Sequence, residues 1–130
     1  MKLVFCMAGK TEKGPVNDLV EEYRKRISRY GPVEIIEAKT LKPQTREGLH
    51  VLLSPDGETM TSEEFSRFIG KSQLGSVKNL FFYIGGPTGF EDDILKNIQK
   101  KISFSSMTFN HQIIRIMLFE QVYRAFTIIN

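Results

Sequence analysis

The sequence predicts an α/β fold in which a mostly parallel sheet lies between helices. Short apolar runs that suit buried strands alternate along the chain with segments whose apolar residues recur every three or four positions, as on one side of a helix. This alternation is typical of parallel strands joined by helical crossovers. Such folds bind ligands at the carboxyl ends of their central strands, so we expect functional residues there.

The composition fits a single domain that spans residues 1–130. Of the 130 residues, 41% are hydrophobic and 25% are charged, and the net charge is +3. These values exclude a disordered or collagen-like chain, and the modest positive charge identifies no partner. Cys6 is the single cysteine, which excludes an internal disulfide, and the sequence begins without a secretory signal. We therefore expect a cytoplasmic protein.

Three strands are predicted in the first half of the chain. Each is a short apolar run bounded by turn-forming residues, and they cover 3–8, 33–36 and 49–53. Residues 54–57 are typical of a turn that follows the third strand. The polar stretch 39–48, which contains Pro43, predicts a loop before it.

Two helices accompany these strands. Apolar residues at helical spacing predict the first over 16–30, where Gly31 and Pro32 end it. Thr61 and Glu64 match a capping box, in which each side chain bonds to the backbone N–H of the other residue. The second helix is therefore predicted to begin there.

The second half predicts a buried strand, a helix, an irregular segment and a long final helix. The apolar run 80–84 is typical of a central strand covered on both faces. The spacing of Ile94, Leu95, Ile98 and Ile102 predicts a helix, whereas 104–109 lacks helical spacing and predicts a strand or loop. Strong helix formers without glycine or proline predict a helix over 111–129.

The final helix should be covered on two sides, because apolar residues occupy most of its circumference. A second subunit could provide the second cover. Charged and polar residues interrupt the apolar run and argue against a membrane span. Arg124 suits an ion pair with Glu120 four residues earlier, or alternatively the recognition of phosphate or carboxylate groups. Arg115 projects to the opposite side of the helix, so it cannot share a site with Arg124 within one subunit.

His111 and the glycine-rich segment after 80–84 are further candidates. The position of His111 at a helix start favours a neutral imidazole, which could act as a base, although a lone histidine without partners at metal spacing is more often structural. Gly85, Gly86 and Gly89 would let a ligand approach the backbone, or would simply make a tight connection. The glycine order matches neither the dinucleotide fingerprint nor the P-loop.

Three linked segments resemble the RlmH family of SPOUT-class methyltransferases, which act on bacterial large-subunit rRNA. They are IGGPTG at 84–89, SFSSMTFNHQ at 103–112 and EQVYRAF at 120–126, with Arg115 between the last two. The resemblance is dense over residues 80–130 and looser in the first half.

This resemblance implies a SPOUT methyltransferase fold, with a trefoil knot in the C-terminal half and a homodimer formed through the C-terminal helix. It implies S-adenosylmethionine as the methyl donor and no metal. The implied cofactor contacts are Leu53, Gly85, Phe104, Ser105, Ser106, Met107, Thr108 and Phe109. Independently of the family, Leu53, Phe104 and Met107 could form an apolar seat for adenine.

The reaction implied is methylation of N3 of a pseudouridine in a 23S rRNA stem-loop of the assembled ribosome. Arg124 is the candidate for orienting the RNA or the anionic ring, and His111 is the candidate base.

Two alternatives stay open. Family members usually continue beyond the position of Asn130 with a tail that holds a tyrosine–histidine pair, and this sequence stops before it. The first alternative is therefore a catalytically impaired dimer that binds cofactor and RNA. The second, which rests on the strand–helix alternation alone, is a flavodoxin-like nucleotide or flavin binder.

Overall fold

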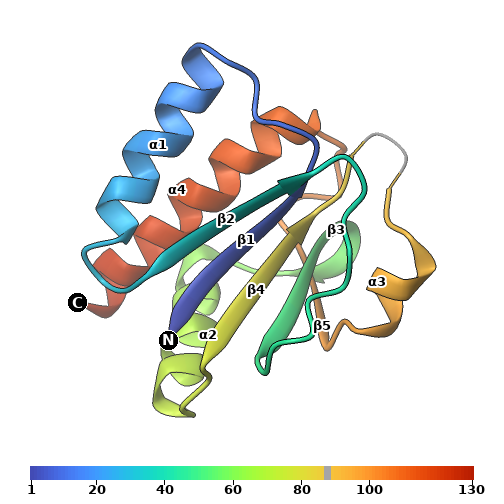
Figure 1. The fold of residues 1–130 in the computed structure, drawn as a ribbon. Helices are drawn as coiled ribbons and strands as arrows, with labels where there is room; N and C mark the ends of the chain where they lie inside the picture. The colour runs from blue at the N-terminus through green and yellow to red at the C-terminus, as the bar shows by residue number, and fades with distance from the viewer. Residues whose placement is uncertain (87–88) are drawn as a thin grey trace.

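A parallel sheet of five strands forms the centre of the computed structural model, which describes residues 1–86 and 89–130 (Figure 1). The strands lie in the order β2-β1-β4-β3-β5, and every neighbouring pair is parallel. This arrangement confirms the predicted parallel sheet. The strands are β1 (Lys2–Ala8), β2 (Val33–Ala38), β3 (Leu49–Thr59), β4 (Asn79–Ile84) and β5 (Lys100–Ser103).

Three helices cover one face of the sheet and a short helix lies on the other (Figure 1). Helices α1 (Pro15–Ile27), α2 (Ser62–Leu74) and α4 (His111–Ile129) pack on the same face, with Phe119 of α4 stacked on Phe5 of β1. Helix α3 (Asp92–Lys96) packs on the opposite face through Ile94, beside Leu41 of the loop between β2 and β3. In the part of the chain described, no helix has the length and apolar character needed to cross a membrane.

Buried apolar residues on both faces explain why β1 and β4 are central. From Leu3 to Met7 and from Leu80 to Ile84 the side chains are almost entirely inaccessible to solvent. Alternate residues of these strands therefore enter two separate cores, one under the three helices and one under α3. This is why the two segments are continuous apolar runs in the sequence.

The predicted capping box is present at the start of α2. The Thr61 side chain accepts from the Glu64 N–H at 3.1 Å, and the Glu64 carboxylate accepts from the Thr61 N–H at 3.2 Å. Helix α1 ends at Ile27, earlier than predicted, and the chain turns through 28–30 before Gly31.

The predicted helix through Ile98 and Ile102 is wrong in its second half. Helix α3 ends at Lys96, and Ile102 lies in β5, where it pairs with Leu53 of β3. Gln99 directs the chain into this strand, because its side chain accepts from the His50 N–H while its own N–H donates to the His50 carbonyl. The isoleucines are spaced like a helix face, but Ile102 is buried through sheet pairing instead.

The third strand extends beyond the predicted end at residue 53. Leu53 and Glu58 both pair with Ile102, so residues 54–57 are an insertion within β3 and not its end. At Gly57 the backbone of β5 comes so close that a Cβ atom would lie 2.8 Å from the Ile102 nitrogen. Glycine is therefore required for this approach.

Candidate functional site

A pocket of about 350 Å³ lies at the carboxyl end of β4, beside residues 53–55 of β3, and we call it the β3–β4 pocket. Its described wall comes from residues 53–55 of β3, the glycine-rich segment after β4, the loop between β5 and α4, and the first turn of α4. Seven of the eight predicted cofactor contacts line it, and Ser106 is the exception. The seven are Leu53, Gly85, Phe104, Ser105, Met107, Thr108 and Phe109.

Gly85 stands where the pocket wall has no room for a side chain. A Cβ atom on this residue would lie 3.0 Å from the Phe90 ring and 3.1 Å from the Gly89 carbonyl oxygen. At Gly86, by contrast, a Cβ atom would meet only the Ala8 methyl group, at 3.6 Å, which is an ordinary contact. The glycine at 85 therefore lets the Phe90 ring and the Gly89 carbonyl pack directly against the backbone at this wall.

Local hydrogen bonds shape the loop between β5 and α4. The Ser103 hydroxyl donates to the Ser105 carbonyl at 2.8 Å, and the Ser105 hydroxyl accepts from the Met107 N–H at 3.0 Å. Asn110 caps α4, since its side-chain oxygen accepts from the Gln112 N–H at 2.7 Å. The loop thus leaves the Met107 side chain 71% exposed beside the pocket, as an apolar surface for a ligand.

A second pocket, of about 520 Å³, lies beside the first, and we call it the β1–β2 pocket. The ends of β1 and β2, the loops after them and the start of α3 line it. Four described residues line both pockets, namely Gly86, Gly89, Phe90 and His111. His111, which the sequence indicated as a helix start and a candidate base, therefore stands between two adjoining cavities.

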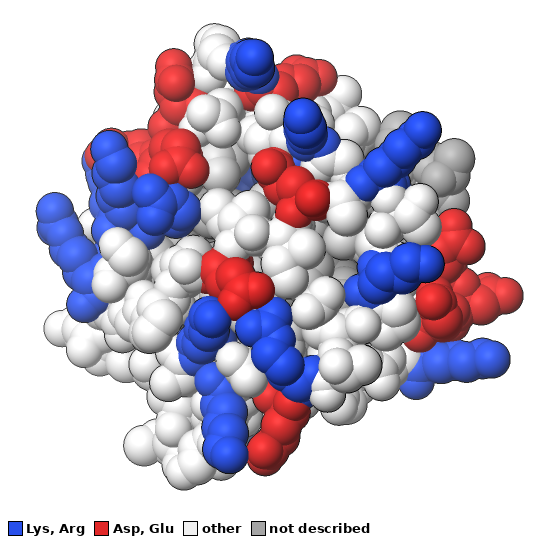
Figure 2. All heavy atoms as spheres, in the orientation of Figure 1, with Lys and Arg blue, Asp and Glu red and all other residues white. Residues whose placement is uncertain are grey.

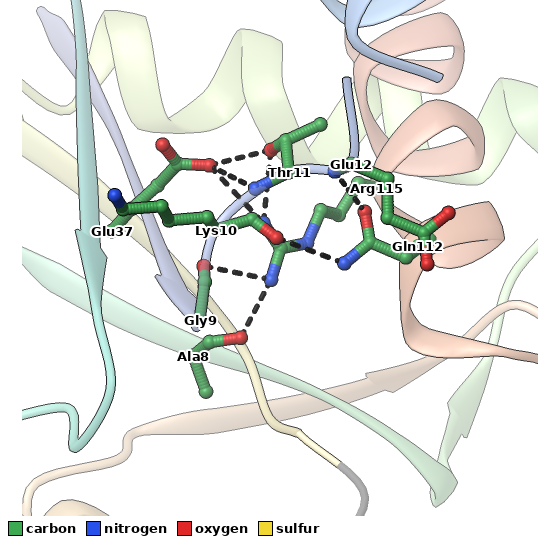
Figure 3. Close-up of polar contacts among 8 residues, drawn as sticks. All are labelled: Ala8, Gly9, Lys10, Thr11, Glu12, Glu37, Gln112 and Arg115. Carbon is green, nitrogen blue, oxygen red and sulfur yellow. Dashed lines mark hydrogen bonds and ion pairs between the residues drawn. The ribbon is translucent and has the colours of Figure 1, made fainter. Parts of the chain in front are cut away.

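Two side chains of α4 hold the loop that follows β1 (Figure 3). Arg115 is completely inaccessible to solvent and donates to the carbonyl oxygens of Ala8 and Gly9 at 2.6 and 3.0 Å. Its other terminal nitrogen donates to the Thr11 hydroxyl at 2.9 Å and to the Glu37 carboxylate at 3.2 Å. Burial lowers the pKa of Arg115, and the negative charge of Glu37 opposes that shift.

Gln112 completes this attachment one turn earlier on α4. Its side-chain amide donates to the Lys10 carbonyl at 3.0 Å and accepts from the Glu12 N–H at 2.9 Å. Sequence reasoning placed Arg115 opposite Arg124 but gave it no partner, because its partners lie about a hundred positions away in the chain. The structure assigns it the role of fixing the wall of the β1–β2 pocket.

Arg124 is not part of either pocket in the described chain. It lies 13 residues after His111 on the same helix, which corresponds to about 20 Å along the axis. Its Nε atom donates to Glu120 at 2.9 Å, so the ion pair expected from the i,i+4 spacing is present. The structure therefore separates the two predicted catalytic residues within one subunit.

Positive charge does not gather into one patch on the visible face. Figure 2 shows acidic and basic side chains interspersed there. On α1, Arg24 pairs with Glu21 and Arg26 pairs with Glu22, so these cations are partly neutralised by their own helix. The described residues also hold no group of three side chains suited to bind a metal ion.

His50, which the sequence left without a role, is buried beside Phe81 and Tyr83, two residues of the core on the α3 side of the sheet. Its Nδ1 atom lies 2.8 Å from the Tyr83 hydroxyl, and its ring stacks on Phe81. Burial lowers the pKa of His50 and raises the pKa of Tyr83 to about 12. Both groups therefore stay neutral and act as structural partners.

Comparison with known proteins decides the family. The family model described as "Predicted SPOUT methyltransferase" matches residues 1–130. Ribosomal RNA large subunit methyltransferase H of Coprothermobacter proteolyticus is 42% identical and aligns with 99% of this chain and 95% of its own length. The chain belongs to the RlmH family of SPOUT methyltransferases. The RlmH protein of Geobacter sp. strain M21 is 41% identical over all of this chain and 96% of its own.

Membership of the RlmH family agrees with the observed architecture. A solved structure of "a probable methylase family protein" from Haemophilus influenzae Rd KW20 superposes with a TM-score of 0.58 and 8% identity, covering 99% of this chain and 66% of that one. This similarity shows a common fold. Two of the three segments that resemble RlmH, 84–89 and 103–112, contribute described residues to the β3–β4 pocket, and the third lies on α4. The family match counts against a flavodoxin-like binder.

Proposed function

We propose that this chain, as one domain, transfers a methyl group from S-adenosylmethionine to N3 of a pseudouridine in a 23S rRNA stem-loop of the assembled ribosome. The relatives' names supply the reaction class and the large-subunit rRNA. The observation that carries the proposal to this chain is the β3–β4 pocket, which is built from the segments that resemble the family.

The residues of the β3–β4 pocket fit the chemistry of this methyl donor. Leu53, Phe104 and Met107 offer apolar surface for an adenine ring, and the Phe90 ring, which packs against Gly85, adds to the pocket wall. Serine and threonine side chains of the loop 103–109 add polar groups that suit a ribose or an amino acid moiety. S-adenosylmethionine would supply a methyl group on a positively charged sulfur, an electrophile for the acceptor nitrogen.

His111 is our proposed base. The N3 position must lose its proton when it becomes the nucleophile, and an imidazole can accept that proton. His111 lies at the boundary of the two pockets, so it can reach the junction between a donor in one and an acceptor in the other. The remaining contribution of the chain is to hold both partners in line.

A homodimer through α4 would give Arg124 a role that its own subunit does not provide. Helix α4 exposes apolar side chains at both ends, including Ile113, Ile128 and Ile129, and such residues suit contact with a second copy. Arg124 could then reach the RNA or the partner's site. Sedimentation equilibrium should give twice the 14.9 kDa chain mass, and a monomer would contradict this part of the proposal.

We also propose the trefoil knot that is typical of SPOUT methyltransferases. Two observations support it. Strand β5 lies next to β3 in the sheet, and the loop that leads from β5 to α4 lines the same pocket as described residues of the earlier glycine-rich segment after β4. An experimental structure that traces residues 80–130 is the test, and a chain that does not pass through a loop would contradict it.

The decisive experiment for the reaction uses ribosomes from a strain without this methylation. Purified protein and labelled S-adenosylmethionine should transfer label to 23S rRNA, and nucleoside mass spectrometry should find a methylated pseudouridine. Cofactor binding by calorimetry without any transfer would support the alternative of an impaired dimer that only binds. Transfer to another nucleotide would contradict the proposed substrate.

A further inference from the structure

The two pockets are arranged as neighbours that share a wall. Gly86, Gly89, Phe90 and His111 line both, so ligands in the two pockets would meet at this boundary. A methyl transfer requires the donor carbon and the acceptor atom to come within about 3–3.5 Å in a defined line. A cavity that adjoins the proposed donor site is therefore where an acceptor has to enter.

The β1–β2 pocket differs in character from its neighbour. Two lysines and two glutamates line it, namely Lys10, Lys39, Glu37 and Glu91, beside the apolar Leu41 and Ile94. Lys10 and Lys39 come from the two loops that follow β1 and β2, so they approach the cavity from adjacent strand ends. Ammonium groups are suited to bind phosphate oxygens, whereas the β3–β4 pocket has no lysine or arginine among its described lining residues.

Hydrogen bonds from two side chains of α4 hold the loop that carries Lys10. Arg115 holds the carbonyl oxygens of residues 8 and 9, and Gln112 holds the backbone on both sides of Lys10, at 3.0 and 2.9 Å. Glu37 bonds to the Thr11 N–H at 2.7 Å and to Arg115, which ties the end of β2 to the same cluster (Figure 3). The backbone around Lys10 is thus held in place before any ligand binds.

We propose that the β1–β2 pocket receives the acceptor nucleotide, and that Lys10 and Lys39 contact the phosphates that flank it. This inference rests on the proposed function, because it uses the β3–β4 pocket as the donor site. The volume of the β1–β2 pocket, about 520 Å³, lies in the range of small-molecule sites and is adequate for one nucleotide turned out of its strand. The base would lie toward His111 and the phosphates toward the two lysines.

The test compares four variants in binding to ribosomes that lack the methylation. Lys10→Ala and Lys39→Ala remove the proposed contacts, Lys10→Arg keeps the charge, and Lys71→Ala removes one lysine from α2, outside both pockets. Co-sedimentation with ribosomes at several salt concentrations, in the presence of S-adenosylhomocysteine, gives the affinity and its salt dependence. Calorimetry with S-adenosylhomocysteine alone gives the donor-site affinity, and initial rates of label transfer give kcat and KM.

Each alanine variant in the pocket should weaken ribosome binding roughly tenfold and raise KM roughly tenfold. The magnitude of the slope of log K against log salt should fall by about 1. Lys10→Arg should restore most of the affinity, Lys71→Ala should change it less than twofold, and all four should bind S-adenosylhomocysteine like the wild type. If the pocket variants match Lys71→Ala, the proposal is wrong. A wild-type protein that binds ribosomes but transfers no label contradicts the proposed function, while the binding comparison still decides the acceptor pocket.

Discussion

The Nη2 atom of Arg115 donates to the Ala8 carbonyl oxygen at 2.6 Å, so the last helix holds the end of the first strand. Because the guanidinium is inaccessible to solvent and makes four such contacts, its removal would leave buried acceptors without donors. Arg115→Ala should lower the free energy of unfolding by about 3 kcal/mol. Urea denaturation measures this, and the exposed Arg67→Ala on α2 is the control, with a change within about 0.5 kcal/mol. Equal urea midpoints would show that this contact is not stabilising.

Gly85, in the wall of the proposed donor pocket, and Gly70, outside both pockets, give a test position and a control position. Gly85→Val would push a side chain against the Phe90 ring and the Gly89 carbonyl, and should weaken S-adenosylmethionine binding at least roughly tenfold. Gly70→Ala on α2, outside both pockets, would place its methyl group at an ordinary 3.7 Å from the Ile129 side chain and should bind within roughly twofold of the wild type. Titration calorimetry checks both. Unchanged affinity in Gly85→Val would remove the β3–β4 pocket as the donor site.

Gly57 should be needed for the stability of the folded protein, because the backbone of β5 passes close to it. A Cβ atom there would lie 2.8 Å from the β5 backbone, so Gly57→Ala must separate β3 from β5. We expect a loss of about 1–3 kcal/mol, seen as a lower melting temperature by circular dichroism. Gly70→Ala on α2, where a Cβ atom would meet only the Ile129 side chain at 3.7 Å, should keep the wild-type melting temperature or raise it. If both variants melt alike, the close approach of β5 is absent.

His50 should make the protein less stable as the pH falls below about 6.5. Burial lowers the pKa of His50 in the folded state, so the unfolded chain binds a proton more readily. Stability is therefore fully present above the ordinary histidine pKa and is lost as the pH falls from there through the lower folded pKa. Chemical denaturation between pH 7.5 and roughly pH 5 should show this loss in the wild type and a smaller one in His50→Gln.

Glu34 affects the pH dependence of stability at lower pH values than His50 does. Arg46, followed by Lys2, lowers the pKa of Glu34 to about 2 through hydrogen bonds to its carboxylate. Its contribution is present above the ordinary glutamate pKa and disappears only as the pH falls toward 2. A pH dependence in His50→Gln equal to that of the wild type between pH 7.5 and 5 would contradict the role of His50.

The strands and long helices could be predicted because their burial follows from nearby residues. The run 80–84 is apolar at every position since both faces of β4 are covered, and the Thr61–Glu64 pair defines a helix start within four residues. The same local reasoning placed Ile102 on a helix, because isoleucines at 94, 98 and 102 have the spacing of a helix face. Pairing with Leu53, 49 positions earlier, determines its actual place in β5.

The candidate site also has a part that could be predicted from the sequence and a part that could not. Residues 104–109 and Gly85 were predicted through the family resemblance, and all but Ser106 among these line the pocket. The β1–β2 pocket was not predicted, because Lys10, Lys39 and His111 come together only when three separate elements pack. No spacing in the sequence indicates that Arg115 would hold residues 8 and 9.

The large sequence separation between α4 and the residues it bonds to affects the order in which the protein folds during synthesis. Gln112 and Arg115 bond to residues 8–12 across separations of 100 to 107 positions, so the turn after β1 stays unfastened while the intervening chain is synthesised. Contacts of such long range form late, after much of the chain entropy has been lost. A nascent chain can therefore fix this turn, which lines the β1–β2 pocket, only once α4 has emerged.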